Sequence, residues 1–489
     1  MRALIMAGGR TMLPAMPPDL HPLSVRSVHM HAHPLFPEPA TAVTSATSHR
    51  RKWVMPLALA AALPLLLGAP GRCQPAAAQK EDTAITRPTP LITGVQVHFG
   101  GKVKGSGYQL APTMAAMRAL DIVSIRDNIA WPLLANTPPA GIAAKLPDFF
   151  SISHRRDLAP PLLTPHGVIS TMDGGELPRS PQALRAFASF TGDSAAQWKG
   201  GHVLFEIWNE WDKGARRGDH GTPEAYVALV KATAPALRKA APDGIILAGG
   251  AADDKGQTPF EWTKAMIDAG GLDAADALSV HIYDHCAPKW LTHAADEMMT
   301  RLDGIHAYAA AHAPGKSDIY VSEFGWPTGR GTCSVPQQEV AENVAQFLLG
   351  ASTRPWIRGA WYYELKDSGQ NPAEIEDNFG LVGFDYRPKP AYCAYQAAAR
   401  LVRDAKPVRR VRQGSAMRVD FVGKDGPVTA IWLADRTRPA QFQTDAATMQ
   451  PMCKPTAPAG RGWGALTAMP ILLRGKSGGP APQVSFKAS

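Results

Sequence analysis

Apolar runs and amphipathic stretches alternate along the chain from residue 92 onward. The apolar runs are short and rich in β-branched and aromatic residues, which is typical of buried strands. The stretches between them have helical spacing, and several begin with proline directly after serine or threonine, as at Ser180 and Thr222. This order favours a helix start, because the hydroxyl can cap the first turn and proline fits within it. We expect strands at Ile92–Phe99, Ile122–Asp127, Pro161–Thr164, Val203–Trp208, Ile245–Gly249, Ala277–His281, Ile319–Glu323 and Gly359–Tyr363.

Eight such strands with helical connectors predict an α/β fold, a (β/α)8 TIM barrel over residues 79–404. The rival is an open doubly wound sheet. That fold would carry a glycine-rich phosphate loop after its first strand, and the sequence has none there.

The pattern changes after Lys406. Ala416–Val422 and Val428–Leu433 read as strands on either side of the turn Gly423-Lys-Asp-Gly426, a good hairpin signal. Met469–Leu473 reads as another strand. We therefore expect a small β-sandwich-like domain over 405–475, followed by a disordered tail over 476–489.

The first 78 residues have the features of a leader. A positive cluster at His49–Lys52 precedes a Leu/Ala-rich run, and Ala76–Ala78 supplies the small residues of a cleavage site. We expect a signal peptide over about 49–78, cleaved near Ala78, and export to the periplasm or the medium. An uncleaved anchor is the alternative, but the apolar run is short for a span and is interrupted by proline.

Cysteine usage fits an oxidising compartment. Cys73 falls inside the leader, which leaves Cys286, Cys333, Cys393 and Cys453. An even number of cysteines in an exported chain favours disulfides, and four cysteines permit three pairings. Cys286 and Cys333 both follow strand-end motifs and should lie in neighbouring loops. A bond between the other two would tie the C-terminal domain to the last barrel helix, whereas four free thiols remain the alternative.

The net charge of +9 is unevenly distributed. Residues 405–489 hold thirteen Lys and Arg against four Asp and Glu, whereas residues 79–404 are net acidic. A basic C-terminal domain of this kind could contact an acidic polymer or an anionic surface weakly. The alternative is a solvated basic face without a partner. Nucleic acid is not expected as a partner, and the oligomeric state stays open.

Two glutamates carry the chemistry. Glu210 ends the motif Trp208-Asn-Glu210 after the fourth predicted strand, and Glu323 lies in Ser322-Glu-Phe-Gly-Trp326 at the end of the seventh. In a barrel these strand ends open into one common mouth. Glycosidic hydrolysis needs two such carboxyl groups, one to protonate the leaving oxygen and one to attack the anomeric carbon.

The two motifs resemble the catalytic segments of retaining glycoside hydrolases of clan A, and within that clan most resemble family 39 and family 5-like exopolysaccharide glycosidases. The resemblance covers residues 92–404. It implies double displacement on the β-glycosidic bonds of a carbohydrate, with Glu210 as acid/base, Glu323 as nucleophile and no cofactor. It also implies that Arg126 and Tyr283 hydrogen-bond the nucleophile and that Asn209 binds the sugar 2-hydroxyl.

The two carboxyl groups need different protonation states. We expect Trp208 and Trp211 to desolvate Glu210 and to raise its pKa. His281 should orient the site and contact substrate. An ordinary buried role remains the alternative for His281 and Tyr283, and an ion pair with Asp127 remains the alternative for Arg126.

Aromatic rings at the mouth are expected to stack on sugars. Each of the candidates follows or ends a strand, and Trp361 on the eighth strand is expected to be the platform below the cleaved sugar. Core packing is the alternative for every tryptophan. The candidate substrate contacts are Trp131, Trp211, Trp326, Trp361 and His166.

Other chemistries fit less well. His281 has acidic and imidazole neighbours, but no matching histidine pair stands on the first strand, so we expect no metal. The sequence has no Gly-x-Ser-x-Gly elbow and no P-loop, which argues against esterase and nucleotide-binding functions. A catalytically retired polysaccharide-binding or assembly protein, and a transglycosylase, are the alternatives to a hydrolase.

Overall fold

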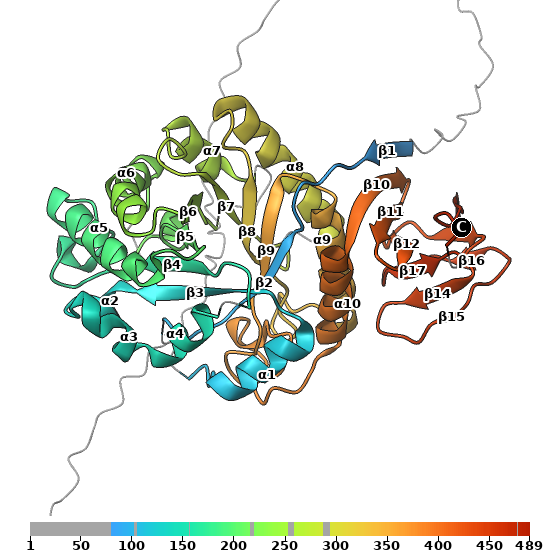
Figure 1. Ribbon diagram of the computed structural model, residues 1–489, viewed down its shortest axis with the longest axis horizontal. Coiled ribbons are helices and arrows are strands. Elements are labelled where there is room, and N and C mark those ends of the chain that lie inside the picture. The colour runs from blue at the N-terminus through green and yellow to red at the C-terminus, as the bar shows by residue number, and fades with distance from the viewer. Residues whose placement is uncertain are drawn as a thin grey trace, which may run out of the picture. The chain divides into compact units, whose positions relative to one another are not determined.

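The computed structural model describes residues 80–101, 105–155, 157–215, 220–252, 259–286, 294–476 and 478–489 (Figure 1). The predicted leader, its signal peptide and the cleavage site near Ala78 lie outside these residues. Across the part of the chain that is described, no helix has both the length and the apolarity that a membrane crossing requires.

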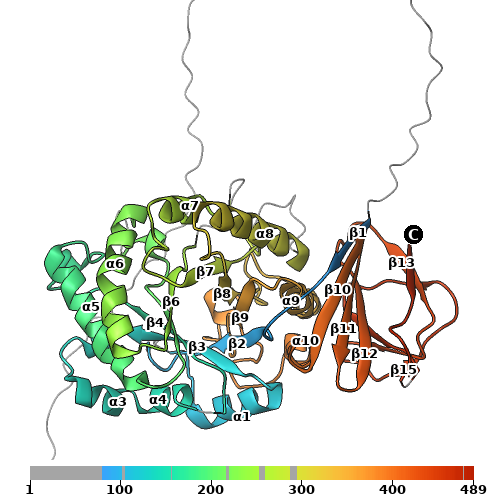
Figure 2. The ribbon, with the colours of Figure 1, turned by 45° about the horizontal axis from the view of Figure 1, so that its top comes forward.

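Eight parallel strands close into a barrel, which confirms the predicted TIM fold. Neighbours in the barrel follow the order of the sequence, and β2 pairs with β9 to close the ring. Helices surround the strands (Figure 2). The barrel strands are β2 (Ile92–Gln96), β3 (Ser124–Ala130), β4 (Leu162–His166), β5 (Leu204–Glu206), β6 (Ile245–Gly249), β7 (Ala277–Ile282), β8 (Ile319–Phe324) and β9 (Ile357–Tyr362).

Two of the helices begin as the sequence predicts. The Ser180 hydroxyl accepts from the Ala183 N–H at 3.2 Å, and the Thr222 hydroxyl accepts from the Ala225 N–H at 3.3 Å. Each bond satisfies an amide that the first helical turn leaves without a partner. The helices are α1 (Leu110–Leu120), α2 (Trp131–Leu134), α3 (Ile142–Lys145), α4 (Pro147–Ser153), α5 (Pro181–Ala195), α6 (Pro223–Ala240), α7 (Glu261–Asp268), α8 (Ala295–His312), α9 (Gln337–Ser352) and α10 (Pro390–Asp404).

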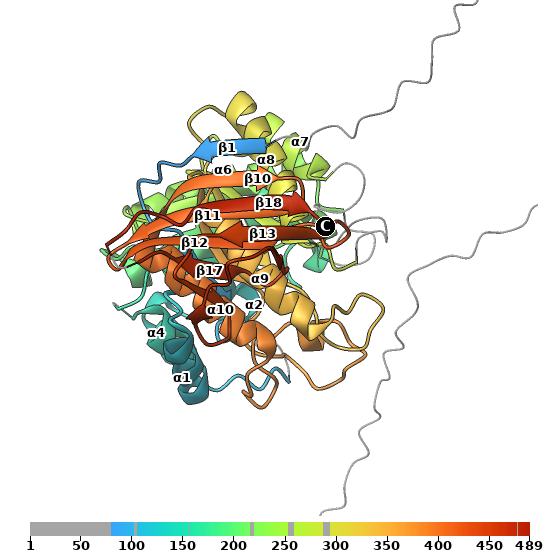
Figure 3. The ribbon, with the colours of Figure 1, turned by 90° about the vertical axis from the view of Figure 1, so that its right-hand side faces the viewer.

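The C-terminal domain consists of two antiparallel sheets (Figure 3). The predicted hairpin is confirmed, because its two strands pair down to Gly423 opposite Gly426. The larger sheet has the order β1 (Lys80–Ala84), β10 (Ala405–Gln413), β11 (Ala416–Gly423), β12 (Gly426–Leu433), β17 (Ile471–Arg474), β14 (Thr448–Pro451) and β15 (Ala457–Pro458). The smaller has the order β16 (Gly464–Ala465), β13 (Ala440–Thr444) and β18 (Val484–Ala488).

The central strand β12 of the larger sheet is buried on both faces. Along β12, Ala430 and Trp432 belong to the main core that includes the barrel, whereas Ile431 and Leu433 belong to a second core with Phe442 of β13. Successive side chains of a strand point to opposite faces, so the alternation places one face on the barrel helices and the other on the smaller sheet. The expected β-sandwich-like domain is therefore present.

Both ends of the described chain differ from the predicted domain limits. Lys80–Ala84 was expected to open the barrel domain but pairs with β10 as an edge strand of the C-terminal domain. The tail from 476 was expected to be loose but contributes β18, which pairs with β13. All five residues of β1 are exposed, so the strand has no apolar alternation that a sequence pattern could reveal.

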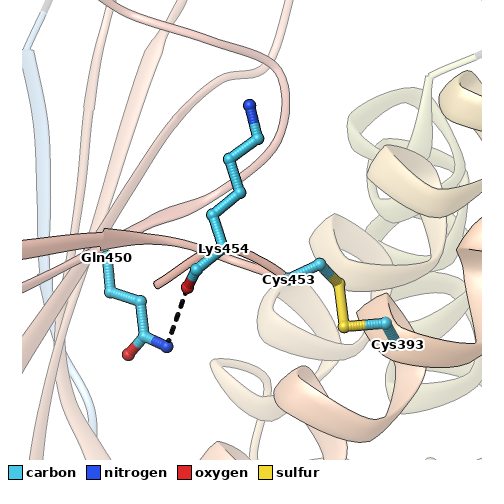
Figure 4. Close-up of a disulfide and its surroundings, with 4 residues drawn as sticks. All are labelled: Cys393, Gln450, Cys453 and Lys454. Atoms are coloured by element: carbon cyan, nitrogen blue, oxygen red, sulfur yellow. Dashed lines mark hydrogen bonds between the residues drawn. A yellow bond between two sulfur atoms is a disulfide. The ribbon is translucent and has the colours of Figure 1, made fainter. Parts of the chain in front are cut away.

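Polar contacts and a disulfide join the C-terminal domain to the barrel. The Gln346 side chain of α9 donates to the Ala468 carbonyl at 2.7 Å, and Arg436 pairs with Glu342 of α9 at 3.0 Å. The Cys393–Cys453 disulfide connects α10 to the loop that follows β14 (Figure 4).

The second disulfide joins two loops of the barrel. Cys286 follows β7 and Cys333 follows β8, and their Cα atoms lie 4.9 Å apart. Of the three pairings that the sequence leaves open, the structure forms the one that joins these neighbouring loops and ties the C-terminal domain to α10, and both disulfides fit an exported protein.

Removing the Cys393–Cys453 disulfide should destabilise the protein. The bond closes a loop of 60 residues, and losing such a constraint typically costs about 2–4 kcal/mol. We expect the double variant Cys393→Ser/Cys453→Ser to unfold at a lower Tm than the oxidised wild type. Wild type assayed with reductant, which also opens the Cys286–Cys333 disulfide, is the control, and its Tm should fall at least as far. Equal Tm values for the oxidised protein and the variant would show that the bond does not constrain the domain.

Candidate active site

The polar residues of the barrel gather at the C-terminal ends of its strands. Arg126, Glu206, His281 and Glu323 come from β3, β5, β7 and β8, and each is buried. The interior below them is closed by apolar side chains that include Leu162, Leu204, Leu247, Tyr320 and Trp361. The site therefore lies at the mouth where active sites of this fold are built.

Arg126 is the centre of the hydrogen-bond network. Its Nη1 donates to Glu323 Oε1 at 2.6 Å and to Gln96 Oε1 at 2.7 Å. Its Nη2 donates to Glu206 Oε2 at 2.7 Å and to Asn209 Oδ1 at 2.8 Å, and its Nε donates to Glu206 Oε2 at 3.0 Å. All five N–H donors of the guanidinium are thus used. Burial alone would lower the pKa of Arg126, but Glu206 and Glu323 raise it above the ordinary value.

Glu206 is a site residue that lies outside the two sequence motifs and was not predicted from them. Besides Arg126, its Oε2 accepts from the Thr164 hydroxyl at 3.0 Å. Burial raises the pKa of Glu206, but Arg126 and His281 outweigh that effect and hold it well below the ordinary value. A signal was available, because an acid inside the apolar strand Val203–Trp208 requires a buried cation as partner.

Glu323 is held by two donors. Arg126 occupies its Oε1, and the Tyr283 hydroxyl donates to its Oε2 at 2.7 Å. Both contacts agree with those that the family resemblance implies. The pairing of β8 is irregular around Glu323, with a register shift toward β7 and another toward β9. Such irregularities re-aim a side chain at the rim of a barrel.

Glu210 lies in a loop with an unusual backbone. Trp208 and Glu210 have φ angles of 69° and 49°, in the left-handed region that side chains other than glycine seldom adopt. The Glu210 N–H donates to the Gly250 carbonyl at 2.8 Å, which fixes the turn against the end of β6. Gly250 itself has a φ of +59°, and a Cβ there would lie 2.7 Å from Glu206 Oε1. Only glycine leaves room for Glu206 at this point.

His281 lies between the two catalytic candidates. Its Nδ1 is 3.3 Å from Glu210 Oε1 and 3.5 Å from Glu323 Oε2. An oxygen of Glu210 and an oxygen of Glu323 lie within 4.8 Å of each other. Retaining glycosidases separate their carboxyl groups by about 5–5.5 Å, and inverting enzymes by about 6.5–9.5 Å. The spacing here suits direct attack by a carboxylate rather than attack by an interposed water.

The charge distribution corrects one prediction. Burial raises the pKa of Glu210 as expected. The opposite effect of His281 and Lys213 is larger, and the pKa falls to about 2. Lys213 Nζ lies 2.5 Å from Glu210 Oε2. Burial lowers the pKa of His281, but Glu323 and the two other glutamates raise it to about 10. In the unliganded site, therefore, Glu210 is ionised and the proton resides on His281.

The same cluster has the spacing of a metal site. Within the described part of the chain, Glu210, His281 and Glu323 offer donor atoms within 4.8 Å of one another. Arg126 and Tyr283 already occupy both oxygens of Glu323, and Lys213 occupies one of Glu210. The neighbouring cations Arg126 and Lys213 also repel the positive charge of a metal ion. The donor set therefore suits an organic substrate better than a metal ion.

The four tryptophans do not line the mouth as expected. All of them are buried, and packing inside or around the barrel uses both their rings and, in three cases, their N–H donors. Trp361 Nε1 donates to Ser124 Oγ at 3.1 Å, Trp326 Nε1 to Asp284 at 2.5 Å, and Trp211 Nε1 to the Thr222 carbonyl at 3.2 Å. Trp131 packs against Phe187 and Phe190. The core-packing alternative holds for all four.

Other residues reach the mouth instead. Tyr363 directly follows β9, is partly exposed, and packs edge-on against His98 and Phe379. Burial and the charges of nearby carboxylates, Glu323 among them, hold the pKa of Tyr363 well above its usual range. His166 ends β4 and is also partly exposed. Burial and the charge of Arg126 lower its pKa to about 4, so His166 is neutral near pH 7.

No protein-family model matches the chain, and no curated protein matches it. Solved structures, in contrast, do match the chain. A family 39 glycoside hydrolase from Bacteroides cellulosilyticus WH2 has a TM-score of 0.61 at 19% identity, over 79% of this chain and 81% of that chain. A GH5_18 protein from Streptomyces cattleya in complex with GlcNAc has a TM-score of 0.53 at 17% identity, over 65% and 81%.

A family 30 subfamily 8 xylanase from Clostridium acetobutylicum has a TM-score of 0.53 at 13% identity, over 83% of this chain and 99% of that chain. At these identities the likeness concerns the fold. This chain shares its barrel fold with these glycoside hydrolases, so the resemblance indicated by the two motifs is confirmed for the fold alone.

The protonated His281 should give the stability of the protein a characteristic pH dependence. Its pKa rises from 6.5 to about 10 on folding, so its contribution is complete below pH 6.5 and is lost as the pH rises toward 10. We expect the Tm of wild type to fall across this window and that of His281→Gln to fall less. The exposed His202→Gln is the control and should follow wild type. Parallel curves for all three proteins would contradict a charged His281.

Proposed function

We propose that the protein is an exported retaining β-glycosidase in which Glu323 is the nucleophile and Glu210 the acid/base. The observation that carries the proposal is the approach of two carboxylates to within 4.8 Å at one barrel mouth, with different partners on each. The two disulfides and the leader-like N-terminal sequence support export.

In the first step Glu323 attacks the anomeric carbon while the bond to the leaving oxygen breaks. Arg126 and Tyr283 hold the Glu323 carboxylate at a fixed angle, so little reorganisation is needed on reaction. A glycosyl-enzyme forms, and Glu210 gives a proton to the leaving oxygen.

The proton for Glu210 is close by. His281 carries one in the unliganded site, with Nδ1 3.3 Å from Glu210 Oε1. Transfer from His281 to Glu210 gives a neutral acid and a neutral imidazole without a change in total charge. In the unliganded site this transfer is unfavourable, because the pKa of His281 is about 10 and that of Glu210 about 2, so a bound substrate must first narrow the difference between the two pKa values.

In the second step the roles reverse. Glu210, now a carboxylate, takes a proton from water as the water oxygen attacks the anomeric carbon, and the bond to Glu323 breaks. A sugar hydroxyl in place of water gives transglycosylation by the same residues.

Substrate contacts follow from the groups that face the mouth. The Asn209 carbonyl oxygen accepts from Arg126, so its amide nitrogen is left to donate to a sugar hydroxyl. Tyr363 replaces Trp361 as the ring against which the cleaved sugar packs. His166, neutral and partly exposed, is a further contact from β4. A carbohydrate, and a polysaccharide in particular, is the partner that these groups suit.

A mechanism-based label tests the nucleophile. We expect 2,4-dinitrophenyl 2-deoxy-2-fluoro-β-glycosides of glucose, galactose, mannose and xylose, tested as a panel, to include one that inactivates the enzyme. Peptide mass analysis should place the sugar on Glu323. A label on another residue would refute the assignment, and turnover of natural β-glycans without any label would argue against a glycosyl-enzyme. A retired barrel would show neither label nor turnover.

Substitutions separate the two roles. Glu323→Ala should abolish hydrolysis of every substrate, because the nucleophile is missing. Glu210→Gln should lose activity by about 100-fold or more on a phenyl glycoside, whose leaving group needs a proton. The same variant should form the glycosyl-enzyme from a dinitrophenyl glycoside at nearly the wild-type rate. Glu224→Gln, an exposed carboxylate of α6, is the control, and equal losses of Glu210→Gln on both substrates would contradict the acid role.

A further inference from the structure

Lys213 stands at the outer side of the acid/base candidate. It ends the short 3-10 turn η4 (Trp211–Lys213), which begins with the buried Trp211. The Lys213 N–H donates to the Glu210 carbonyl at 3.1 Å, so the turn returns the lysine to the glutamate that precedes it. Lys213 Nζ then reaches Glu210 Oε2 at 2.5 Å.

Lys213 differs from the other cations of the site in its accessibility. The side chains of Arg126 and His281 are 1% and 0% exposed, whereas that of Lys213 is 56% exposed. Arg126 and His281 are each fixed by several partners. Lys213 is a flexible ammonium with three donors, and a ligand that enters the mouth can reach it.

The ion pair with Lys213 opposes protonation of Glu210, which a catalytic acid requires. Glu210 must hold a proton when the leaving oxygen departs, and a lysine at 2.5 Å stabilises the ionised form. A sugar hydroxyl competes poorly for the ammonium, because the hydroxyl is neutral whereas Glu210 carries the opposite charge. A carboxylate on the substrate competes on equal terms.

The surroundings of Glu210 restrict what can enter. Several groups face it from different elements of the mouth, and most of them are acids or tyrosines. An added anion is therefore tolerated only if its charge is balanced. When a substrate carboxylate pairs with Lys213 and Glu210 takes up one proton, the net charge of the cluster stays the same. The facing groups are Asp212, Lys213, His281, Tyr283, Glu323, Tyr363 and Glu376.

We propose that Lys213 recognises a carboxylate on the leaving-group sugar, so that the substrate is a saccharide with a uronate next to the cleaved bond. This inference rests on the proposed function, because Glu210 marks the leaving-group side only if it is the acid. The bound carboxylate takes Lys213 from Glu210 and leaves Glu210 able to accept its proton. The basic C-terminal domain, with thirteen Lys and Arg against four Asp and Glu, favours the same class of polymer.

Acceptor kinetics test the leaving-group side directly. The 2-fluoroglycosyl-enzyme is formed first and then released by methyl β-D-glucuronide or methyl β-D-glucoside, and by the galacturonide and galactoside pair. We expect one uronide to reactivate wild type about ten-fold faster than its neutral counterpart, since an ion pair replaces a neutral contact. Lys213→Gln should lose this preference, Lys213→Arg should keep it, and Lys231→Gln on α6 should behave as wild type.

The outcomes separate the two proposals. An enzyme that does not become labelled contradicts the proposed function, whereas a labelled enzyme without a uronide preference overturns only the role of Lys213. A preference that survives in Lys213→Gln overturns it as well. The label needs no acid, so its formation by Lys213→Gln also shows that the variant is folded.

A pH profile gives a second readout that a merely structural lysine would not move. Hydrolysis of a neutral phenyl glycoside requires protonated Glu210 and declines as the pH rises through the pKa of that group. Lys213 lowers this pKa, so Lys213→Gln should shift the decline to higher pH. An unchanged profile in Lys213→Gln would overturn the coupling between the two residues.

Discussion

One buried guanidinium holds the mouth of the barrel together. A charge in the interior is costly unless it is paired and every donor is bonded, and Arg126 meets both conditions with five hydrogen bonds. Its partners come from β2, β5, the loop after β5 and β8. Withdrawing Arg126 would leave Glu206 and Glu323 as uncompensated buried anions. The position of the candidate nucleophile is therefore inseparable from the stability of the barrel.

The two glutamates are supported in different ways. Glu323 belongs to a strand of the closed barrel, where neighbours on both sides restrict it. Glu210 lies in a loop whose left-handed residues are held by a hydrogen bond to Gly250. A nucleophile needs a fixed line of attack, whereas an acid/base must adjust between the leaving oxygen and the incoming water. Among the described residues, only Glu210 of the two glutamates has an exposed partner, Lys213, beside its carboxylate.

Sequence patterns predicted the parts of the molecule that repeat a local rule. The eight strands, the hairpin at Gly423–Gly426 and the two disulfides follow from apolar runs, turn residues and cysteine positions. The predicted role of Trp361 as a sugar platform was wrong. Successive side chains of a strand point to opposite faces, and no local signal tells whether a ring points into the packed interior or the open mouth. The edge strand β1 was not predicted, because it is exposed along its whole length. Lys213 was missed because its importance depends on a contact with Glu210, not on a pattern.

The partners of the two glutamates decide which of them can change its protonation. Those of Glu323 are Arg126, which is buried and fully bonded, and Tyr283, whose pKa burial and the Glu323 charge hold well above its usual range. Neither can leave or lose its proton near neutral pH. The partners of Glu210 are His281, whose Nδ1 lies 3.3 Å from Glu210 Oε1, and Lys213, which is exposed and which we propose to exchange Glu210 for a substrate anion. A fixed environment suits a group that must stay ionised until it attacks. An exchangeable environment suits a group that must gain and lose a proton in every cycle, and this difference fits the acid/base role that we propose for Glu210.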